Sequence, residues 1–510
     1  MTESRTKNTA RNFTFGALAQ VLNTIVSFIV RTVFIKVLGK EYLGVNGLFT
    51  NILTVLSFAE LGIGNAIIYS MYKPVAEGDK EKIKSLMQIY KRAYTVIGIV
   101  VFTVGLLITP FLGDIVKDKP NINESLALIY FLFLLNTSLS YFVTYKKSII
   151  SAYQQEYIIN KYKILFFVIK SILQVICLLV THDFVSYLLI QVVCTFMENL
   201  CVSIRAQEMY PYLNERNIEQ ISKDERKGIF SNVKALVMYK FGSVILNGTD
   251  NIIISKMIGV VTVGIYSNYL MIVSAVTAVV SNALAGFTSS VGNLNATATS
   301  TQQEKVFYDM FFITAWIFGF CAIALLLLLN PFIEIWIGDG YLLDKFTVFA
   351  IVLHFFVNGM QTTGYIYRTT SGLFVKGKNA PVIAAMINIV LSIVLGRYMG
   401  ITGIILATSV ARLLTTAWLD PVLVHKYELE ESPLKYFKKY GEYVMIIAFN
   451  YCICYLVTRN FGVGAWSFIL KGLTIMLFSN LIFFAFFHKK QEFKNFIERL
   501  KVLLKSVKVK

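Results

Sequence analysis

The sequence predicts an all-α polytopic membrane protein of 14 transmembrane helices, built as two pseudo-symmetric six-helix lobes followed by two C-terminal helices. Three observations support this fold class. Of the 510 residues, 56% are hydrophobic and only 15% are charged, against about 25% charged in soluble domains. The apolar residues fall into windows of about 20 residues, the length that crosses a bilayer. Lys and Arg gather in alternate loops, as the positive-inside rule requires.

The first lobe is predicted over residues 1–206. Charged residues and turn formers separate its apolar windows, and its first window ends without the small-residue cleavage site of a signal peptide. Because six spans return the chain to the side on which it began, the polar stretch 207–231 is predicted to be a cytoplasmic linker. The six spans are predicted at residues 12–37, 44–70, 92–112, 124–145, 160–181 and 184–206.

The second lobe is predicted over residues 232–425, and two further spans lie within 440–487. The tail 488–510 alternates lysines with apolar residues at spacings of three and four, which predicts a basic amphipathic helix on the inner membrane surface. For this tail, a membrane anchor is favoured over a partner-docking site. The later spans are predicted at residues 232–257, 262–289, 307–330, 345–370, 379–397, 402–425, 440–459 and 463–487.

The distribution of Lys and Arg orients these spans. With the N-terminus inside, 35 of the 48 basic residues fall in loops on the N-terminal side and 8 in the opposite loops. We therefore expect a multi-pass protein of the cell (cytoplasmic) membrane with both termini in the cytoplasm. The net charge of +18 is explained by these loops, so nucleic acid is not an expected partner.

The two lobes are predicted to be a repeat with an offset of 220 residues. Because six spans return the chain to the same side, the repeats are parallel and related by an axis along the membrane normal. The same offset aligns a polar stripe on the first span with one on the seventh, and two such stripes facing each other predict a wet central cavity. The aligned pairs are Lys36 and Lys256, Gly39 and Gly259, and Gly44 and Gly264, and the stripes are Gln20, Asn23, Ser27 and Arg31 on one span and Lys240, Ser243, Asn247 and Asn251 on the other.

Ionisable side chains within a span are costly against lipid, so they mark candidate sites. For Arg31 and Lys240, lining the cavity is favoured over a structural role, whereas for Arg412 and Lys170 the two roles are evenly balanced. The excess of cations favours an anionic substrate, because guanidinium groups grip phosphate through two parallel hydrogen bonds. The candidate substrate-binding residues are Arg31, Lys240, Asn247, Asn251, Arg412 and Lys170.

Two acidic residues, Asp250 and Glu60, are candidates for coupling to H⁺ or Na⁺. Asp250 is equally well explained as a salt-bridge partner of Arg31 or Lys240. No catalytic residues, metal ligands or cofactor are expected, because the four histidines show no metal spacing and no phosphate-binding loop motif is present. The acidic residues within FIEIWIGDGYLLD keep an outer-face polymerase or glycosyltransferase as a remote alternative.

The segments VLGKEYLGVNGLFTNILTVLSFAELGIGNAI (37–67) and NGTDNIIISKMIGVVTVGIYSNYLMIV (247–273) resemble Wzx-type polysaccharide repeat-unit flippases of the multidrug/oligosaccharidyl-lipid/polysaccharide exporter (MOP) superfamily. The resemblance implies two six-span lobes around a cationic cavity and carries over Asp250 and the cationic lining. It also implies transport of an undecaprenyl-diphosphate-linked oligosaccharide to the outer leaflet for surface polysaccharide (capsule, exopolysaccharide or O-antigen). Membrane lipids and polysaccharide polymerase or assembly proteins are the partners implied.

The related branches remain alternatives. They flip lipid-linked peptidoglycan or teichoic acid precursors or export drugs by cation coupling, and the motifs do not separate the glycan branches. A diphosphate and a sugar cannot cross hydrocarbon unaided, because buried polar groups without partners are costly. We expect residues 1–206 to rock against residues 229–425, so that the polar head crosses a wet interior while the lipid tail stays in the bilayer.

Overall fold

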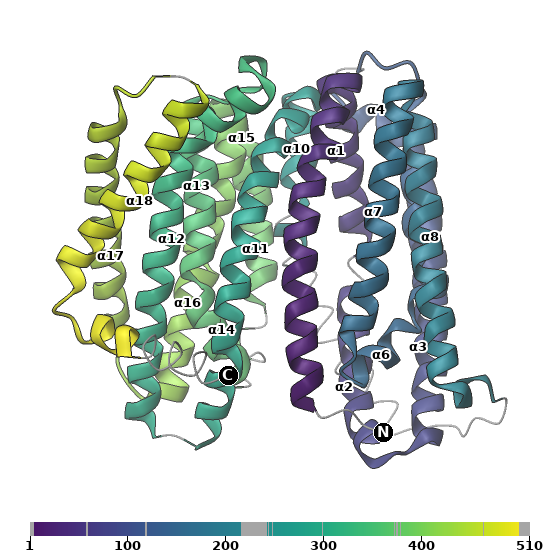
Figure 1. The fold of residues 1–510 in the computed structure, drawn as a ribbon, viewed down its shortest axis with the longest axis horizontal. Helices are drawn as coiled ribbons and strands as arrows, with labels where there is room; N and C mark the ends of the chain where they lie inside the picture. Colours follow the sequence, from purple (N-terminus) through teal and green to yellow (C-terminus); the bar gives the residue numbers. More distant parts are fainter. Residues whose placement is uncertain are drawn as a thin grey trace. The chain divides into compact units, whose positions relative to one another are not determined.

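The computed structural model describes residues 5–57, 60–117, 120–215, 242, 244–246, 248–297, 299–371, 373, 376, 377, 379–462 and 464–498. Within this part of the chain every regular element is a helix, which confirms the predicted all-α polytopic fold class. The chain divides into two compact units, Met1–Ser267 (unit 1) and Asn268–Lys510 (unit 2). Figure 1 shows the helices of both units in sequence colours.

Unit 1 consists of long helices joined by short turns. Asp79 caps α3 by accepting a hydrogen bond from Lys82 N at 2.9 Å, and Asp183 caps α8 by accepting from Val185 N and Ser186 N. Helix α1 packs on α7, and α8 packs on both α5 and α7. Its elements are α1 (Arg5–Leu56), α2 (Glu60–Glu77), α3 (Lys80–Ile108), η2 (Thr109–Phe111), α4 (Leu112–Ile115), α5 (Leu126–Thr144), α6 (Lys147–Ala152), α7 (Glu156–Thr181), α8 (Phe184–Met209), η3 (Pro211–Asn214), α10 (Asp250–Met257) and the start of α11 (Val260–Thr297).

Unit 2 is built around α12, which packs on α13, α17 and α18. A buried aromatic cluster joins α12 to α17, where Phe311 lies 4.6 Å from Tyr436 between ring centroids. Asp344 caps α13 through hydrogen bonds from Phe346 N and Thr347 N. The elements after α11 are α12 (Ser300–Ile337), η4 (Asp339–Tyr341), α13 (Lys345–Met360), α14 (Thr362–Thr370), α15 (Ala380–Leu414), α16 (Thr416–Val424), the π-helical turn η5 (His425–Leu429), α17 (Leu434–Thr458) and α18 (Ala465–Phe487).

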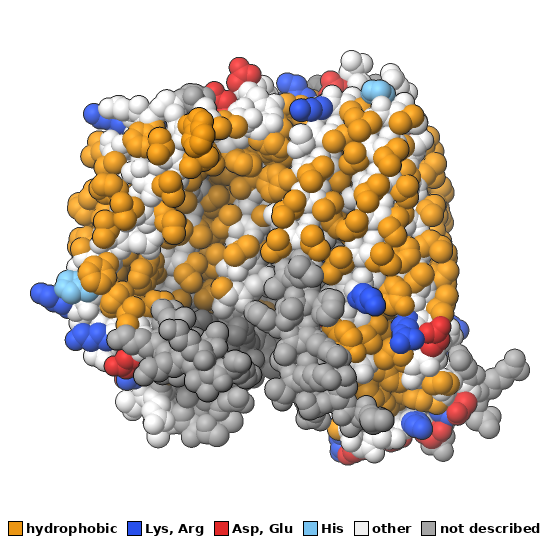
Figure 2. All heavy atoms as spheres, in the orientation of Figure 1, with side chains coloured by type: hydrophobic (Ala, Val, Ile, Leu, Met, Phe, Trp, Pro, Cys, Tyr) orange, Lys and Arg blue, Asp and Glu red, His pale blue; other side chains and the backbone are white. Residues whose placement is uncertain are grey.

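Eleven helices in the described part of the chain are long and apolar enough to cross a membrane. Hydrophobic side chains cover the visible flanks of the helices, and Lys and Arg lie toward the helix ends (Figure 2). The predicted count of 14 stays a prediction for two reasons. Much of predicted span 232–257, including residues 232–241, lies outside the described residues. The predicted boundaries between spans 12–37 and 44–70 and between spans 379–397 and 402–425 fall inside single elements, α1 and α15.

A glycine breaks each of these two elements. The backbone is non-helical at Gly39 (φ 83°) in α1 and at Gly400 (φ 59°) in α15. A straight helix of 52 residues would be about 78 Å long, far beyond the roughly 30 Å of a bilayer core. Phe34 and Tyr42, on the two sides of the break in α1, both pack on the ring of Phe184 at the start of α8.

The glycines aligned by the predicted repeat share backbone features. Gly259, the equivalent of Gly39, also has a positive φ (142°) and separates α10 from α11. Gly44 and Gly264 lie against each other, since a Cβ added at Gly264 would lie 2.8 Å from Gly44 N. A Cβ at Gly44 would lie 2.0 Å from the carbonyl oxygen of Val260. The repeat motif therefore marks a close contact between the backbones of α1 and α11.

The units divide within α11, whereas the predicted lobes divide at the linker 207–231. The start of the second repeat is part of unit 1 because α10 packs on α1 and α4, and Lys117 N donates to Ser255 O at 3.2 Å. Most of the linker lies outside the described residues, so the predicted domain boundaries stay a prediction.

The described part of the tail packs on unit 2. Phe493 is buried and stacks on Trp316 of α12 at 5.7 Å between ring centroids. Asn495 donates a hydrogen bond to Asp309 Oδ1 at 2.9 Å, and Glu492 pairs with Lys439 of α17. The apolar face predicted to enter the membrane surface thus contacts the protein's own helices at Phe493.

Candidate functional site

Arg31 lies on α1, eight residues before the break at Gly39. Its Nη2 donates a hydrogen bond to the hydroxyl of Ser267 on α11, and its guanidinium also interacts electrostatically with Tyr187 of α8. Arg31 is partly buried. The guanidinium of Arg31 therefore connects three helices of unit 1, and its five N–H groups make it a cationic hydrogen-bond donor.

Asp250 and Asn251 are the first two residues of α10. Asn251 is buried, and Asp250 interacts electrostatically with the phenol of Tyr266 on α11. Tyr266 directly precedes Ser267, the partner of Arg31. The structure therefore brings the predicted cation and the predicted acid to adjacent residues of α11.

A second feature of unit 1 is a pocket of about 260 Å³ lined by α1, α5 and α8, which we call the hydroxyl–amide pocket. Thr54 and Thr137 donate their hydroxyl protons to backbone carbonyls of their own helices, which leaves their oxygen lone pairs as acceptors. The buried Asn136 Oδ1 accepts no hydrogen bond from the described residues. The pocket thus suits a ligand that donates many hydrogen bonds. It is lined by Thr50, Leu53, Thr54, Ser57, Phe133, Asn136, Thr137 and Gln191.

Glu60, at the start of α2, lies among phenol groups. Tyr94 donates a hydrogen bond to its Oε1 at 3.3 Å, and Tyr90 donates to Tyr94 at 3.1 Å. Tyr141 hydrogen-bonds both Glu60 and Ser57, and Ser57 lines the hydroxyl–amide pocket. Glu60 is therefore linked to that pocket rather than to the region of Arg31 and Asp250.

Lys170 lies within α7, with its ammonium 5.5 Å from the ring centroid of Phe167. Its charge interacts with that of Glu198 on α8, and Glu198 also pairs with Lys147 at 3.3 Å. The nearby carboxylate of Glu198 favours a structural role for Lys170 over substrate binding. The place of Lys170 in the substrate site stays a prediction.

The other predicted substrate-binding residues lie in unit 2 or outside the described residues. Arg412 belongs to unit 2, where it is buried near the end of α15 and interacts electrostatically with His354 of α13. Lys240 and Asn247 lie outside the described residues.

The hydroxyl–amide pocket was not predicted from the sequence. Asn136, Thr137 and Gln191 are uncharged and form no periodic pattern with other polar residues, so no spacing marks them. A search for neutral hydrogen-bonding side chains in mid-span would have found Asn136 and Gln191, but without their common pocket. Among the described residues, no group of three His, Cys, Asp or Glu side chains could hold a metal ion.

Residues 9–288 match the family model described as "Polysaccharide biosynthesis protein". No curated protein matches the chain. The chain is also similar in fold to solved structures of three transporters, at 12–15% sequence identity.

The first of these is the lipid II flippase MurJ in an inward closed conformation, with a TM-score of 0.66 at 15% identity over 92% of this chain and 98% of that chain. The second is an inward-facing multidrug resistance MATE family transporter of the MOP superfamily, with a TM-score of 0.62 at 13% identity over 80% of this chain and 94% of that chain. The third is the Vibrio cholerae MATE transporter VcmN in the bent form, with a TM-score of 0.53 at 12% identity over 84% of this chain and 98% of that chain. These proteins are transporters rather than enzymes, which agrees with the non-enzymatic prediction.

Proposed function

Because the chain belongs to the polysaccharide biosynthesis protein family and has the MurJ- and MATE-like fold of the MOP superfamily, we propose that it is a flippase for a lipid-linked oligosaccharide. Its substrate is an undecaprenyl-diphosphate-linked repeat unit of a surface polysaccharide. The repeat unit moves from the inner to the outer leaflet of the cytoplasmic membrane, and both termini of the chain face the cytoplasm.

The observation that carries this proposal is the presence of two complementary features in unit 1. Arg31 supplies a cationic donor for a diphosphate. The hydroxyl–amide pocket supplies uncharged acceptors for the hydroxyl groups of sugars. A lipid-linked oligosaccharide needs both kinds of group, whereas its polyprenyl tail needs only lipid.

The cycle we propose is alternating access by rocking of residues 1–206 against residues 229–425. The glycine motif predicts a parallel repeat, and parallel repeats are one of the arrangements by which transporters expose a midplane site to the two sides of the membrane in turn. Asp250 and Glu60 are the proposed sites for coupling to H⁺ or Na⁺, and no other cofactor is proposed. Polysaccharide polymerase or assembly proteins would receive the product.

The test is deletion of the gene, followed by measurement of lipid-linked intermediates in each leaflet. We expect undecaprenyl-linked repeat units to accumulate in the inner leaflet and surface polysaccharide to fall. Complementation with Arg31→Gln should restore little export while the protein remains in the membrane, because a charge-assisted hydrogen bond is worth about 1.5–3 kcal/mol, or roughly a tenfold to hundredfold loss of binding. Arg205→Gln, an exposed change at the end of α8, is the matched control and should complement fully.

A different result would contradict the proposal. Normal surface polysaccharide with accumulation of peptidoglycan or teichoic acid precursors would assign the chain to a related lipid-linked substrate. A loss of polysaccharide with repeat units that reach the outer leaflet unpolymerised would instead point to an outer-face polymerase or glycosyltransferase.

A cation-coupled drug exporter is the second candidate, and the surroundings of Glu60 favour it. A carboxylate ringed by Tyr90, Tyr94 and Tyr141 is a suitable site for a cation, because phenol rings and carboxylates both attract positive charge. Drug sensitivity of the deletion strain, with normal lipid-linked intermediates, would support this candidate and overturn the flippase.

A further inference from the structure

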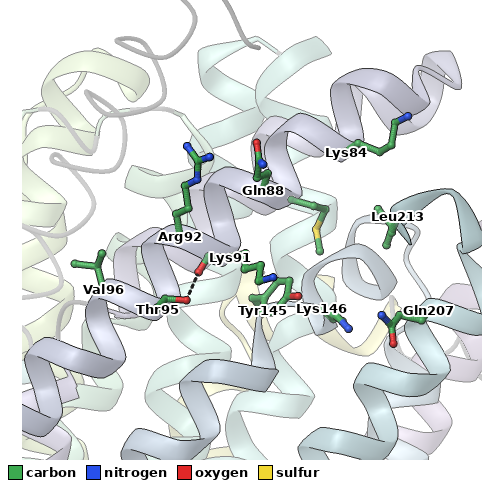
Figure 3. A pocket seen from close by; sticks show the side chains of 11 residues that line it. Lys84, Gln88, Lys91, Arg92, Thr95, Val96, Tyr145, Lys146, Gln207 and Leu213 are labelled. Atoms are coloured by element: carbon green, nitrogen blue, oxygen red, sulfur yellow. Dashed lines mark hydrogen bonds between the residues drawn. The ribbon is translucent and has the colours of Figure 1, made fainter. Parts of the chain in front are cut away.

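A larger pocket of about 700 Å³ lies in unit 1, apart from the residues discussed above. It is bounded by α3, by the segment that follows α5, by the end of α8 and by η3 (Figure 3). Four cationic side chains line it: Lys84, Lys91, Arg92 and Lys146. We call it the basic pocket.

One of the four cations is neutralised within the protein. The ammonium of Lys84 lies 2.6 Å from Glu81 and 2.7 Å from Glu215, and its side chain is only 3% exposed. In the part of the chain that the structure describes, Lys91, Arg92 and Lys146 form no ion pair with a carboxylate. The pocket therefore carries a local excess of positive charge.

Two of these cations face the same space. In Figure 3, Lys91 extends from α3 toward Tyr145 and Lys146, and Gln207 of α8 lies beyond them. Burial, together with the charge of Lys91, lowers the pKa of the Lys146 ammonium. Because Lys146 is partly buried and is repelled by Lys91, an anion between the two ammonium groups stabilises both charges.

The position of the basic pocket indicates which kind of anion reaches it. Along α3 the sequence changes from KEKIKSLMQIYKR to an apolar run, and Val96, at the edge of the pocket, is 59% exposed. Ile99 and Val100, one turn further along, are also exposed. The pocket thus lies where the lipid-facing surface begins, on the side that the positive-inside rule assigns to the cytoplasm.

We propose that the basic pocket binds the phosphate group of an anionic phospholipid from the cytoplasmic leaflet. Lys91 and Lys146 contact the phosphate, Arg92 contributes at the rim, and the acyl chains lie along Val96 and the apolar face of α3. Anionic headgroups attract basic residues at the membrane surface, and a pocket of this size holds a complete headgroup. This lipid site is independent of the transport substrate.

The test uses the purified full-length chain in nanodiscs that contain either phosphatidylglycerol or phosphatidylcholine, with retained lipid counted by native mass spectrometry. The wild type should retain phosphatidylglycerol selectively. Lys91→Gln combined with Lys146→Gln should weaken lipid affinity about 25-fold, since each lysine near the surface contributes about 1 kcal/mol, or roughly fivefold in affinity. Lys161→Gln with Lys163→Gln, two exposed lysines of α7 outside the pocket, is the charge-matched control and should retain the lipid.

Three outcomes would overturn the proposal. Equal retention by both double variants would show that the pocket contributes nothing specific. Equal retention of phosphatidylcholine would exclude recognition of an anion. Displacement of the lipid by glycerol 1-phosphate at the same concentration would assign the pocket to a soluble phosphate. If the Gln double variant fails to fold, two other variants are compared. Lys91→Arg with Lys146→Arg keeps both charges and should retain phosphatidylglycerol, whereas Arg92→Gln removes one charge and should retain less.

Discussion

Asn136 presents a buried carbonyl oxygen that accepts no hydrogen bond from the described residues. Such a group costs about 1–3 kcal/mol unless a ligand or water satisfies it. Replacing Asn136 by Leu should therefore leave the protein in the membrane and stabilise it slightly while lowering transport. The measurement is export of lipid-linked repeat units beside thermal unfolding in detergent. A variant with unchanged export would remove the hydroxyl–amide pocket from the transport path.

A second residue-scale prediction concerns the ion pair of Arg368 and Asp420. Both side chains are almost fully buried, and Arg368 also donates to the carbonyl oxygen of Lys376 at 3.1 Å. Asp420→Ala leaves an uncompensated buried guanidinium and should lower the free energy of unfolding by about 3–5 kcal/mol. Arg368→Met with Asp420→Leu should recover most of this loss. A double variant as unstable as Asp420→Ala would contradict this account.

At the residue scale, the sequence located charged candidates better than neutral ones. The polar stripe on the first span and the repeat pointed to Arg31 and Asp250, and both residues interact with neighbouring residues of α11, although their role in a site stays a prediction. The phenols around Glu60 and the lining of the hydroxyl–amide pocket come from helices far apart in the sequence. Their meeting depends on helix packing, which periodicity within one span does not encode.

At the scale of elements, the close approach of α1 and α11 requires glycine. Gly44→Ala would place a methyl group 2.0 Å from the Val260 carbonyl oxygen, so the helices must separate. We expect lower expression and a reduced melting temperature. Gly16→Ala on the same helix is the control, because nothing lies within 4 Å of its added methyl group and alanine favours helices. Equal melting temperatures for the two variants would show that the glycine contact is dispensable.

The tail gives an element-scale prediction about pH. Burial opposes the effect, but the hydrogen bond and charge of Lys439 hold the pKa of Glu492 below its usual value of 4.5. A lowered pKa means that Glu492 stabilises docking of the tail above pH 4.5, and that this contribution is lost as the pH falls through the lowered pKa. Fluorescence of Trp316, which stacks on Phe493, should report release of the tail in acid.

The control for this measurement is Glu492→Gln. It should weaken docking near neutral pH and remove the part of the transition that depends on this carboxylate. An acid transition of the same midpoint and size in the variant would assign the release to other groups.

For the whole molecule, the alternation of basic loops predicts which loops face outward. In a chain without its native cysteines, Asp114→Cys should react with a membrane-impermeant thiol reagent in intact cells, because loop 113–123 is predicted outside. Glu77→Cys should react only after permeabilisation, because its loop is predicted in the cytoplasm. Both side chains are exposed, so access and not burial decides the result. Reaction of Glu77→Cys in intact cells would reverse the orientation.

The fold class was readable from the sequence because apolar windows and basic loops are imposed by the bilayer itself. The breaks at Gly39 and Gly400 fall between predicted spans 12–37 and 44–70 and between 379–397 and 402–425. A hydropathy window does not sense a positive φ, so the form of each break was not predicted. The packing of Phe493 on Trp316 was missed for a similar reason, since an amphipathic pattern does not distinguish lipid from a neighbouring helix.

The contact between Gly44 and Gly264 also bears on how the chain arose. In a homodimer with a two-fold axis, a residue on the axis touches its own copy in the other subunit. Gly44 and Gly264 stand in that relation within one polypeptide. If the predicted repeat arose by duplication and fusion of a self-pairing ancestor, this contact is what that ancestor's interface would leave. In such an ancestor a single mutation would alter both sides of the interface at once, whereas after fusion each glycine can change alone and be compensated by the other.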